Sequence, residues 1–418
     1  MTGETAPLPH DGPIRLARSG RWASSGLAAM AITSLALRPP LTVVGPLTPS
    51  MLADGELSIA QVGLLGSVPL VVFAMFSWLV PALLRGMRIT TVLATAMAAV
   101  VAGSALRLVP ETALLYLGTA LVAAGLCVTN VLLPVAARTF FPDQVGRVTG
   151  ICTALISAGG GAGVALALPL TDGLDIQWRM VLAVTAAVSV VAVLAWLAPS
   201  LRAYETALPR PQAASTPQLT RVGDVLTAGI FFGAQASFFY LAASWLLPLL
   251  MEKSLSIEQA AFGVGAFSLA GVVTCLVTPS LALGRVGLRG MVVVAAVLQC
   301  AGAIGVLLGS GGIALGAAVV LAIGVTSAFS LSIVIFSITA ESAAATLALS
   351  GRAQSVGYVV AGGLPFTAGL VRTLTGSWIA VEVTMLVLAA VTFVCGLLAI
   401  GRRRGGGTSA SRGDVAGT

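Results

Sequence analysis

Arg38 is the residue of this sequence with the clearest potential for chemistry. It lies in the middle of a long apolar run, roughly residues 24–51, and no other basic residue of the chain has such a position. An arginine at the centre of a bilayer costs roughly 2.5–3.5 kcal/mol on insertion scales, so it is kept where something inside the protein satisfies it. The pattern predicts a site for an anionic or strongly polar molecule. The alternative is a structural role, in which Arg38 bonds backbone carbonyls or a buried carboxylate.

Two prolines directly after Arg38 predict a break in its helix. Pro39 and Pro40 have no amide hydrogen, and each disfavours helical geometry at the residue before it. Gly45 and Pro46 weaken the helix again a few residues later. We expect a half-helix to begin shortly after Arg38. Many transporters bind their substrates at such discontinuous helices near the bilayer midplane.

The composition is that of a polytopic membrane protein. Of 418 residues, 57% are hydrophobic and 9% are charged, more apolar surface than a soluble core can bury. The net charge of +7 comes with arginines in short loops, which the positive-inside rule explains better than a nucleic-acid partner does. The five cysteines lie in apolar runs without metal-ligand spacing, and the single histidine, His10, lies in a polar tail. We therefore expect no metal site, no cofactor and no enzyme activity.

Twelve apolar runs are long enough to span a bilayer. Their approximate ranges are 24–51, 57–84, 88–107, 112–137, 146–170, 177–198, 224–251, 257–283, 288–309, 312–337, 349–372 and 377–400. The longest polar interruption divides them six and six. We expect an N-terminal tail (1–23), an N-terminal six-helix bundle (24–198), a cytoplasmic linker (199–223), a C-terminal six-helix bundle (224–400) and a second tail (401–418).

Loop charges predict the orientation. With the N-terminus inside, the basic residues of the outer segments are only Arg107, Arg179, Lys253 and Arg372, and the other loop arginines are cytoplasmic. The positive-inside rule then predicts that both termini are cytoplasmic. We expect a multi-pass protein of the inner membrane that contacts the lipid bilayer.

The two halves of the sequence repeat one another. Residues 57–61 (LSIAQ) return as residues 255–259 (LSIEQ), and Pro81 corresponds to Pro279. A Gly-Arg pair opens both the fifth run and the eleventh, at residues 146 and 351. Two parallel six-helix halves joined by a linker are typical of a major-facilitator architecture, with substrate held between the halves.

Several motifs resemble the cyanate and nitroimidazole transporters, the CynX/NimT branch of the major facilitator superfamily. They are the Arg-Pro, Thr and Gly-Pro pattern of residues 37–47, the Asn-x-x-x-Pro of Asn130 and Pro134, the stretch from Gly146 through Arg179, and residues 235–237, 245–248 and 354–358. The resemblance covers nearly the whole membrane region. It implies an all-α membrane protein with twelve transmembrane helices in two pseudo-symmetric six-helix bundles. The implied function is a secondary active or facilitative transporter for a cyanate-, nitroimidazole- or small-carboxylate-like solute.

The loops that carry the superfamily's conformational motif differ between the halves. The loop between runs two and three has Arg85 and Arg88 but no acid. Its counterpart has Gly284, Arg285 and Arg289 and keeps more of the motif. The resemblance thus implies a conformational loop in each half, with the second half more important.

The resemblance also implies that runs one, four, seven and ten line a central cavity. The proposed substrate-binding residues beside Arg38 are Thr42, Asn130, Gln235, Tyr240, Gln354 and Tyr358. Packing or backbone bonding is an open alternative for Asn130, Gln354 and Tyr358. In run seven, a stripe at helical spacing (Phe231, Gln235, Phe238, Ala242 and Trp245) faces this cavity, or else its aromatic rings face lipid or pack against other helices. Glu382, an acid inside the last run, is expected to be a structural ion-pair or hydrogen-bonding partner.

A multidrug or metabolite efflux transporter of the same fold is the main alternative function. It would have a larger, more apolar cavity that does not rely on Arg38. A sensor without transport would normally carry a soluble domain, and neither tail is long enough for one. The sequence leaves uniport, antiport and symport open, with protons as one candidate coupling ion, and we expect a monomer.

Overall fold

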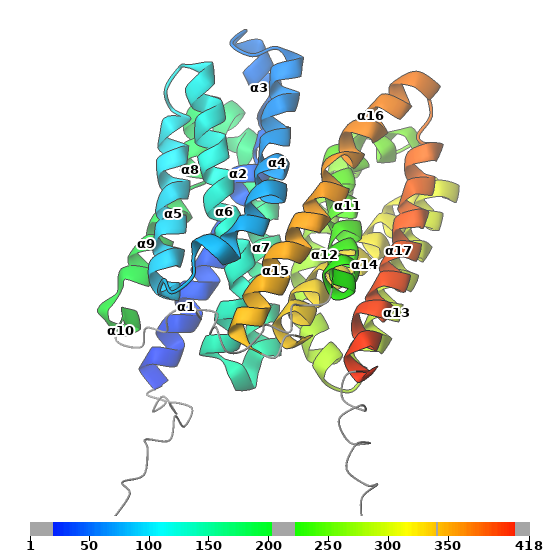
Figure 1. The fold of residues 1–418 in the computed structure, drawn as a ribbon. Helices are drawn as coiled ribbons and strands as arrows, with labels where there is room; N and C mark the ends of the chain where they lie inside the picture. The colour runs from blue at the N-terminus through cyan, green and yellow to red at the C-terminus, as the bar shows by residue number, and fades with distance from the viewer. Residues whose placement is uncertain (1–19, 203–221, 340–341, 406–418) are drawn as a thin grey trace, which may run out of the picture.

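The computed structural model describes residues 20–202, 222–339 and 342–405, so most of both tails and of the linker lies outside the described residues. Within these ranges the regular structure is entirely helical (Figure 1). The helices are α1 (Gly20–Ala36), α2 (Pro39–Thr42), α3 (Val44–Ala53), α4 (Ile59–Leu83), α5 (Ile89–Leu106), α6 (Thr112–Phe140), the 3₁₀ turn η1 (Pro142–Gln144), α7 (Val145–Leu168), the π-helical turn η2 (Pro169–Gly173), α8 (Trp178–Val184), α9 (Ala187–Leu197), α10 (Pro199–Arg202), α11 (Val222–Glu252), α12 (Ile257–Leu283), α13 (Gly287–Leu308), α14 (Gly311–Thr339), α15 (Ala343–Gly362), α16 (Leu364–Thr375) and α17 (Ile379–Gly405).

The twelve predicted spans are present. In the described part of the chain, eleven helical segments are long and apolar enough to cross a membrane. The remaining predicted run, residues 349–372, is the pair α15 and α16, which meet at Gly363 and rise as one column in Figure 1. The proline near the start of α16 explains the interruption, because proline is favoured in the first turn of a helix and disfavoured beyond it.

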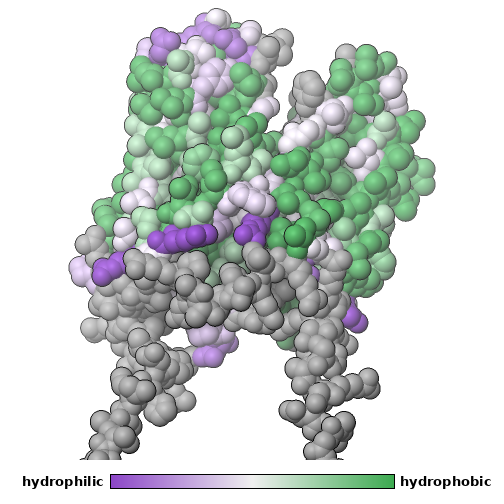
Figure 2. All heavy atoms as spheres, viewed as in Figure 1, coloured by the Kyte–Doolittle hydropathy of each residue, from purple (hydrophilic) through white to green (hydrophobic). Residues whose placement is uncertain are grey.

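The spans form two bundles, α1–α10 and α11–α17. The bundles lie close together at the end where α1 begins and α17 ends, and they diverge toward the other end (Figure 1). Figure 2 shows the same arrangement as a notch between two lobes, and the flanks of both lobes are largely hydrophobic. The apolar flanks suit contact with lipid, and the notch lies at the end away from the start of α1 and the end of α17.

The start of α4 and the start of α12 have the same local structure. Each helix begins with a capping box: Ser58 bonds reciprocally with Gln61, and Ser256 does so with Gln259. A capping box satisfies two amide groups that the first turn of a helix leaves without partners. The repeated pentapeptide is thus a repeated helix start, one in each bundle.

The two bundles meet along an inter-bundle seam formed by α7 with α12 and by α15 with α4. Glycines make the approach close. A Cβ on Gly150 would lie 2.9 Å from the Leu276 carbonyl oxygen, and a Cβ on Gly351 would lie 2.7 Å from Pro81 Cγ. The seam therefore pairs a glycine-bearing helix of each bundle with a proline-bearing helix of the other, as expected for two related halves.

Polar groups on neighbouring helix pairs also join the two bundles. Arg138 on α6 donates from Nη1 to the Ser337 carbonyl at 2.8 Å, and Ser350 on α15 donates to the Val131 carbonyl at 3.1 Å. The hydroxyls of Thr153 and Ser330 lie 3.2 Å apart. Opening the seam would break these bonds, so they stabilise the conformation described here.

The two loops predicted to control conformation are exposed. Arg85 and Arg88 lie between α4 and α5, and Gly284, Arg285 and Arg289 lie between or at the ends of α12 and α13. Each loop has a glycine in the left-handed region, Gly86 at φ 73° and Gly287 at φ 77°. The matching turns fit the internal repeat, and their conformational role stays a prediction.

Candidate functional site

The first span is broken at Arg38. α1 ends at Ala36, and the single turn α2 begins with Pro39 and Pro40 in its first two positions. The amides of Leu41 and Thr42 both bond the Arg38 carbonyl at 3.0 Å. The hydrogen bonding of a new helical turn therefore begins at the Arg38 carbonyl, because the proline rings fit a helix start but not a helix interior.

The glycine-rich part of α7 packs against this break. The Thr42 hydroxyl bonds the Gly160 carbonyl at 3.0 Å. A Cβ on Gly163 would lie 2.9 Å from Pro39 Cα, and a Cβ on Gly159 would overlap the Leu35 carbonyl oxygen. The glycines are needed here because backbone, rather than a flexible side chain, lies opposite them.

We expect Gly159→Ala to destabilise the protein by about 1–3 kcal/mol, the usual cost of an extra carbon in a well-packed contact. The added Cβ would push α7 away from the end of α1, so solute binding should fall as well. Thermal unfolding in detergent measures the effect. Gly66→Ala is the matched control, because nothing lies within 4 Å of a Cβ at Gly66. Equal stability of the two variants would show that α7 is not closely packed on the break.

The Arg38 side chain extends from the N-terminal bundle toward two aromatic rings of the C-terminal bundle. Its Cζ lies 4.1 Å from the ring centroid of Phe239 on α11 and 5.4 Å from that of Phe329 on α14. A guanidinium over an aromatic face gains about 0.5–2 kcal/mol, depending on how dry the site is. Arg38 therefore lies between the bundles.

The guanidinium of Arg38 is incompletely bonded. Its Nη1 is buried without a hydrogen-bond partner. Among the described residues, no carboxylate forms an ion pair with Arg38. No described carbonyl or carboxylate bonds Arg38 Nη1, as the structural alternative would require, and the role of Arg38 stays a prediction. An aromatic face does not replace an acceptor, so this group can still bind one.

Two of the predicted tyrosines lie among aromatic rings. Tyr240 is half-buried beside Phe239, with ring centroids 5.4 Å apart. Tyr358 is buried and lies between rings of both bundles, 4.8 Å from Phe73 and 5.2 Å from Phe232. The structure thus brings Tyr240 to the Arg38 region and Tyr358 to an aromatic contact across the seam.

Gln354 and Asn130 are joined to one another. Gln354 on α15 is 1% exposed, and its Nε2 donates to the Asn130 carbonyl at 3.2 Å and to Ser350 Oγ at 2.8 Å. This contact crosses from the C-terminal to the N-terminal bundle. In this conformation the amide donors of Gln354 are therefore occupied by protein. Gln235 is buried on α11, one turn before Phe239.

The larger members of the aromatic stripe on α11 lie inside the C-terminal bundle. Phe231 and Phe238 belong to separate apolar clusters of that bundle, and Trp245 lies 5.3 Å from the Trp378 ring. These three rings therefore pack against other helices of the C-terminal bundle. The ring that meets Arg38 is Phe239, one position away from the stripe.

Arg107, which the loop charges predict to lie in an outer segment, follows the last residue of α5 and turns its side chain inward. The side chain is 1% exposed, and its Nη1 donates to the Pro40 carbonyl at 3.2 Å. An arginine at the end of an apolar run can extend to water or turn inward, and the sequence does not distinguish these directions. A second, buried arginine therefore contacts the turn that follows Arg38.

Glu382 forms an ion pair, as expected from its position in the last run. Its Oε1 lies 3.0 Å from Lys253 Nζ, and its side chain is 1% exposed. Lys253 also donates to the Leu307 carbonyl at 2.8 Å. The pair joins the ends of α11, α13 and α17, and it is separate from the Arg38 region.

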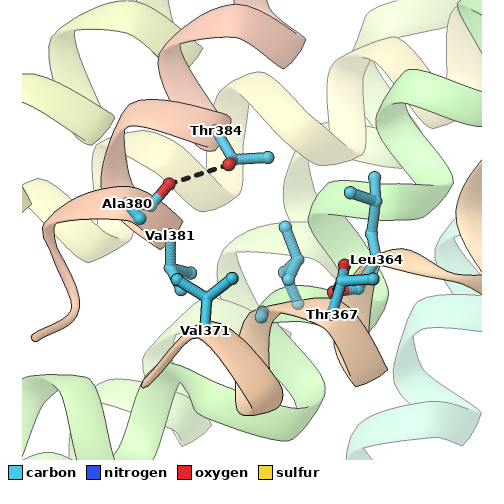
Figure 3. Close-up of a pocket in the computed structure, with 8 residues that line it drawn as sticks. Leu364, Thr367, Val371, Ala380, Val381 and Thr384 are labelled. Carbon is cyan, nitrogen blue, oxygen red and sulfur yellow. Dashed lines mark hydrogen bonds between the residues drawn. The ribbon is translucent and has the colours of Figure 1, made fainter. Parts of the chain in front are cut away.

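A small cavity of about 60 Å³ lies between α11, α16 and α17 (Figure 3). It is lined by Leu241, Leu364, Thr367, Ala368, Val371, Ala380, Val381 and Thr384. The Thr384 hydroxyl bonds the Ala380 carbonyl at 2.8 Å within its own helix, rather than turning into the cavity as a free donor. None of the predicted binding residues lines this cavity, so it is not the candidate site.

Known proteins match this chain over most of its length. The model of the Major Facilitator Superfamily matches residues 23–365. The chain is 28% identical over 374 residues to the 2-nitroimidazole transporter of Escherichia coli K12, covering 89% of this chain and 94% of the relative. It is 27% identical over 400 residues to the uncharacterized transporter YycB of Bacillus subtilis 168, covering 95% and 97%. Its identity to the cyanate transport protein CynX of E. coli K12 is 24% over 354 residues, covering 84% and 91%.

Solved structures share the fold. The fucose transporter FucP in its outward conformation matches with a TM-score of 0.66 and 16% identity, over 89% of this chain and 98% of FucP. The proton:xylose symporter XylE matches with a TM-score of 0.74 and 12% identity, over 92% and 96%. At these identities the likeness concerns the fold alone.

Proposed function

The chain belongs to the major facilitator superfamily, and from this premise we propose that it is a secondary active or facilitative transporter of a small polar or anionic solute. The observation that carries the proposal is the Arg38 guanidinium. It lies at a helix break between the two bundles, and its Nη1 has no hydrogen-bond partner. A solute with a negative or strongly polar group would supply that acceptor and form a charge-assisted hydrogen bond, which is stronger than a neutral one.

The relatives support the solute class. Two are named as transporters of 2-nitroimidazole and cyanate, both small and polar. A cyanate-, nitroimidazole- or small-carboxylate-like solute would fit beside the Arg38 guanidinium and the Phe239 ring that it covers, because its polar edge can bond Arg38 Nη1 while its body contacts the aromatic side chains there.

Six further residues are proposed to contribute to binding: Thr42, Asn130, Gln235, Tyr240, Gln354 and Tyr358. Tyr240 is the strongest of these, because its ring contacts Phe239, the ring that the Arg38 guanidinium covers. Gln354 would first have to release the Asn130 carbonyl, so we assign its contribution to the opposite conformation.

Alternating access explains how such a site would move solute. With both termini in the cytoplasm, the notch of Figure 2 opens to the outside of the inner membrane. The inter-bundle seam closes the cytoplasmic side and would open in the other state, with the monomer as the working unit. Protons remain one candidate coupling ion.

A thermal-shift screen of the purified protein tests the proposal. The probes are cyanate, formate, acetate and 2-nitroimidazole, with cationic dyes as the arm for multidrug efflux. We expect at least one of the small solutes to raise the melting temperature, and counterflow in proteoliposomes to show its exchange. Stabilisation by the dyes alone would contradict the proposed solute class and favour efflux.

A further inference from the structure

The Arg107 side chain connects the outer end of α5 to the helix break. Arg107 follows the last residue of α5, and its guanidinium reaches the carbonyl of Pro40 at 3.2 Å. Pro40 belongs to the one-turn helix α2. The amide N–H groups of Leu41 and Thr42, the first two after the prolines, donate to the Arg38 carbonyl. Arg107 therefore contacts the same turn from which Arg38 projects.

The route of the Arg107 side chain is set by its surroundings. A Cβ on Gly118 of α6 would lie 3.1 Å from Arg107 Cγ, so glycine leaves room for the side chain to pass. The Arg107 carbonyl accepts a bond from Arg179 Nη1 at 3.0 Å, and Arg179 is paired with Glu56 at 2.6 Å. The backbone from which the guanidinium starts is thus held by an ion pair at the rim of the bundle.

The charge of Arg107 has little else to bond. Its Nε and Nη2 are buried without hydrogen-bond partners, and no described carboxylate forms an ion pair with it. Burying an incompletely bonded charge is costly, so an apolar side chain would fill this space at lower free energy. Packing alone therefore does not explain an arginine at this position, whereas its hydrogen bond to the Pro40 carbonyl does.

We propose that Arg107 is a positioning residue of the Arg38 site. By holding the Pro40 carbonyl, it fixes the turn after Arg38 and thereby sets the direction of the Arg38 guanidinium toward Phe239. Arg107 acts from inside the N-terminal bundle and does not itself touch solute. The inference rests on the proposed function for the meaning of the site, but its geometry can be tested alone.

The test uses a fluorine label on the ring that Arg38 covers. 4-Trifluoromethylphenylalanine replaces Phe239, and its ¹⁹F resonance is recorded in detergent without solute. Arg38→Met should shift this resonance, because it removes the charge 4.1 Å from the ring. Arg107→Met should also shift it, by a comparable amount, and Arg107→Lys, which keeps a charged donor, should restore at least half of the shift.

Two controls separate positioning from general damage. Arg372→Met removes an arginine at the rim of the C-terminal bundle, where it pairs with Glu252, and should leave the resonance unchanged. A second label at Phe262, which is 67% exposed on α12, reports general unfolding and should not move in any variant. Arg107→Gln, which keeps a neutral amide donor, is measured in parallel as a milder replacement.

The inference is overturned if the ¹⁹F resonance at position 239 is unchanged in Arg107→Met and Arg107→Gln but shifts in Arg38→Met. A shift at both labels would overturn it too, because it would indicate a purely structural role. No solute is present, so this result does not depend on transport. The proposed function fails separately, when none of the small solutes binds.

Discussion

Arg38→Met is expected to weaken solute binding and, at the same time, to raise the resistance of the protein to thermal unfolding. A hydrogen bond to a charged group contributes about 1.5–3 kcal/mol, so its loss should weaken binding at least about 10-fold and up to about 100-fold. The free protein, in contrast, should gain, because an arginine at the bilayer centre costs about 2.5–3.5 kcal/mol and Arg38 has no acceptor on Nη1. The opposing signs distinguish a binding residue from a structural one.

Melting temperature with and without acetate, cyanate or 2-nitroimidazole measures both effects on the same samples. Arg38→Lys should fall between the two proteins, because lysine keeps the charge but not the planar group that lies over Phe239. If Arg38→Met is less stable and binds solute as well as the unaltered protein does, Arg38 has a structural role rather than a binding role.

Lys253→Met should be the most destabilising of the charge replacements. It leaves Glu382, 1% exposed, without its partner 3.0 Å away. Breaking a buried ion pair from one side costs about 3–5 kcal/mol, because the remaining charge is not compensated. Glu382→Leu should cost less, since Lys253 is 19% exposed and keeps its bond to the Leu307 carbonyl.

The double variant Lys253→Met/Glu382→Leu should recover most of the lost stability, because it removes both charges. Arg372→Gln is the matched control. Arg372 Nη2 lies 3.2 Å from Glu252 Oε2, but more than a third of the Glu252 side chain is exposed. We therefore expect this variant to lower the free energy of unfolding by about 0–1 kcal/mol. Additive losses in the double variant would show that the two residues stabilise the protein independently.

Much of the architecture follows from local pattern. The twelve runs arise because each span must be apolar over its whole length, which leaves a signal that does not depend on packing. The repeated pentapeptides predict related halves because capping boxes depend on four adjacent residues. The break at Arg38 is equally local, since proline lacks the donor that a helix interior requires.

The surroundings of the site depend on which helices meet. Helical spacing groups residues on a face of α11, but it does not say whether that face meets its own bundle or the other one. Phe239 rather than the stripe meets Arg38 because of the way α11 is rotated in the bundle. Gln354 bonds the Asn130 carbonyl because α15 crosses α6 at that level.

The twelve spans, the two related halves and the broken first helix can all be predicted from the amino-acid sequence, because they depend on hydropathy and on the backbone chemistry of proline, serine and glutamine over a few residues. That Arg38 points at the opposite bundle, and that Arg107 turns inward to Pro40, depends on how distant helices pack. A long side chain has many rotamers and several possible acceptors within reach, and the packing of distant helices selects among them.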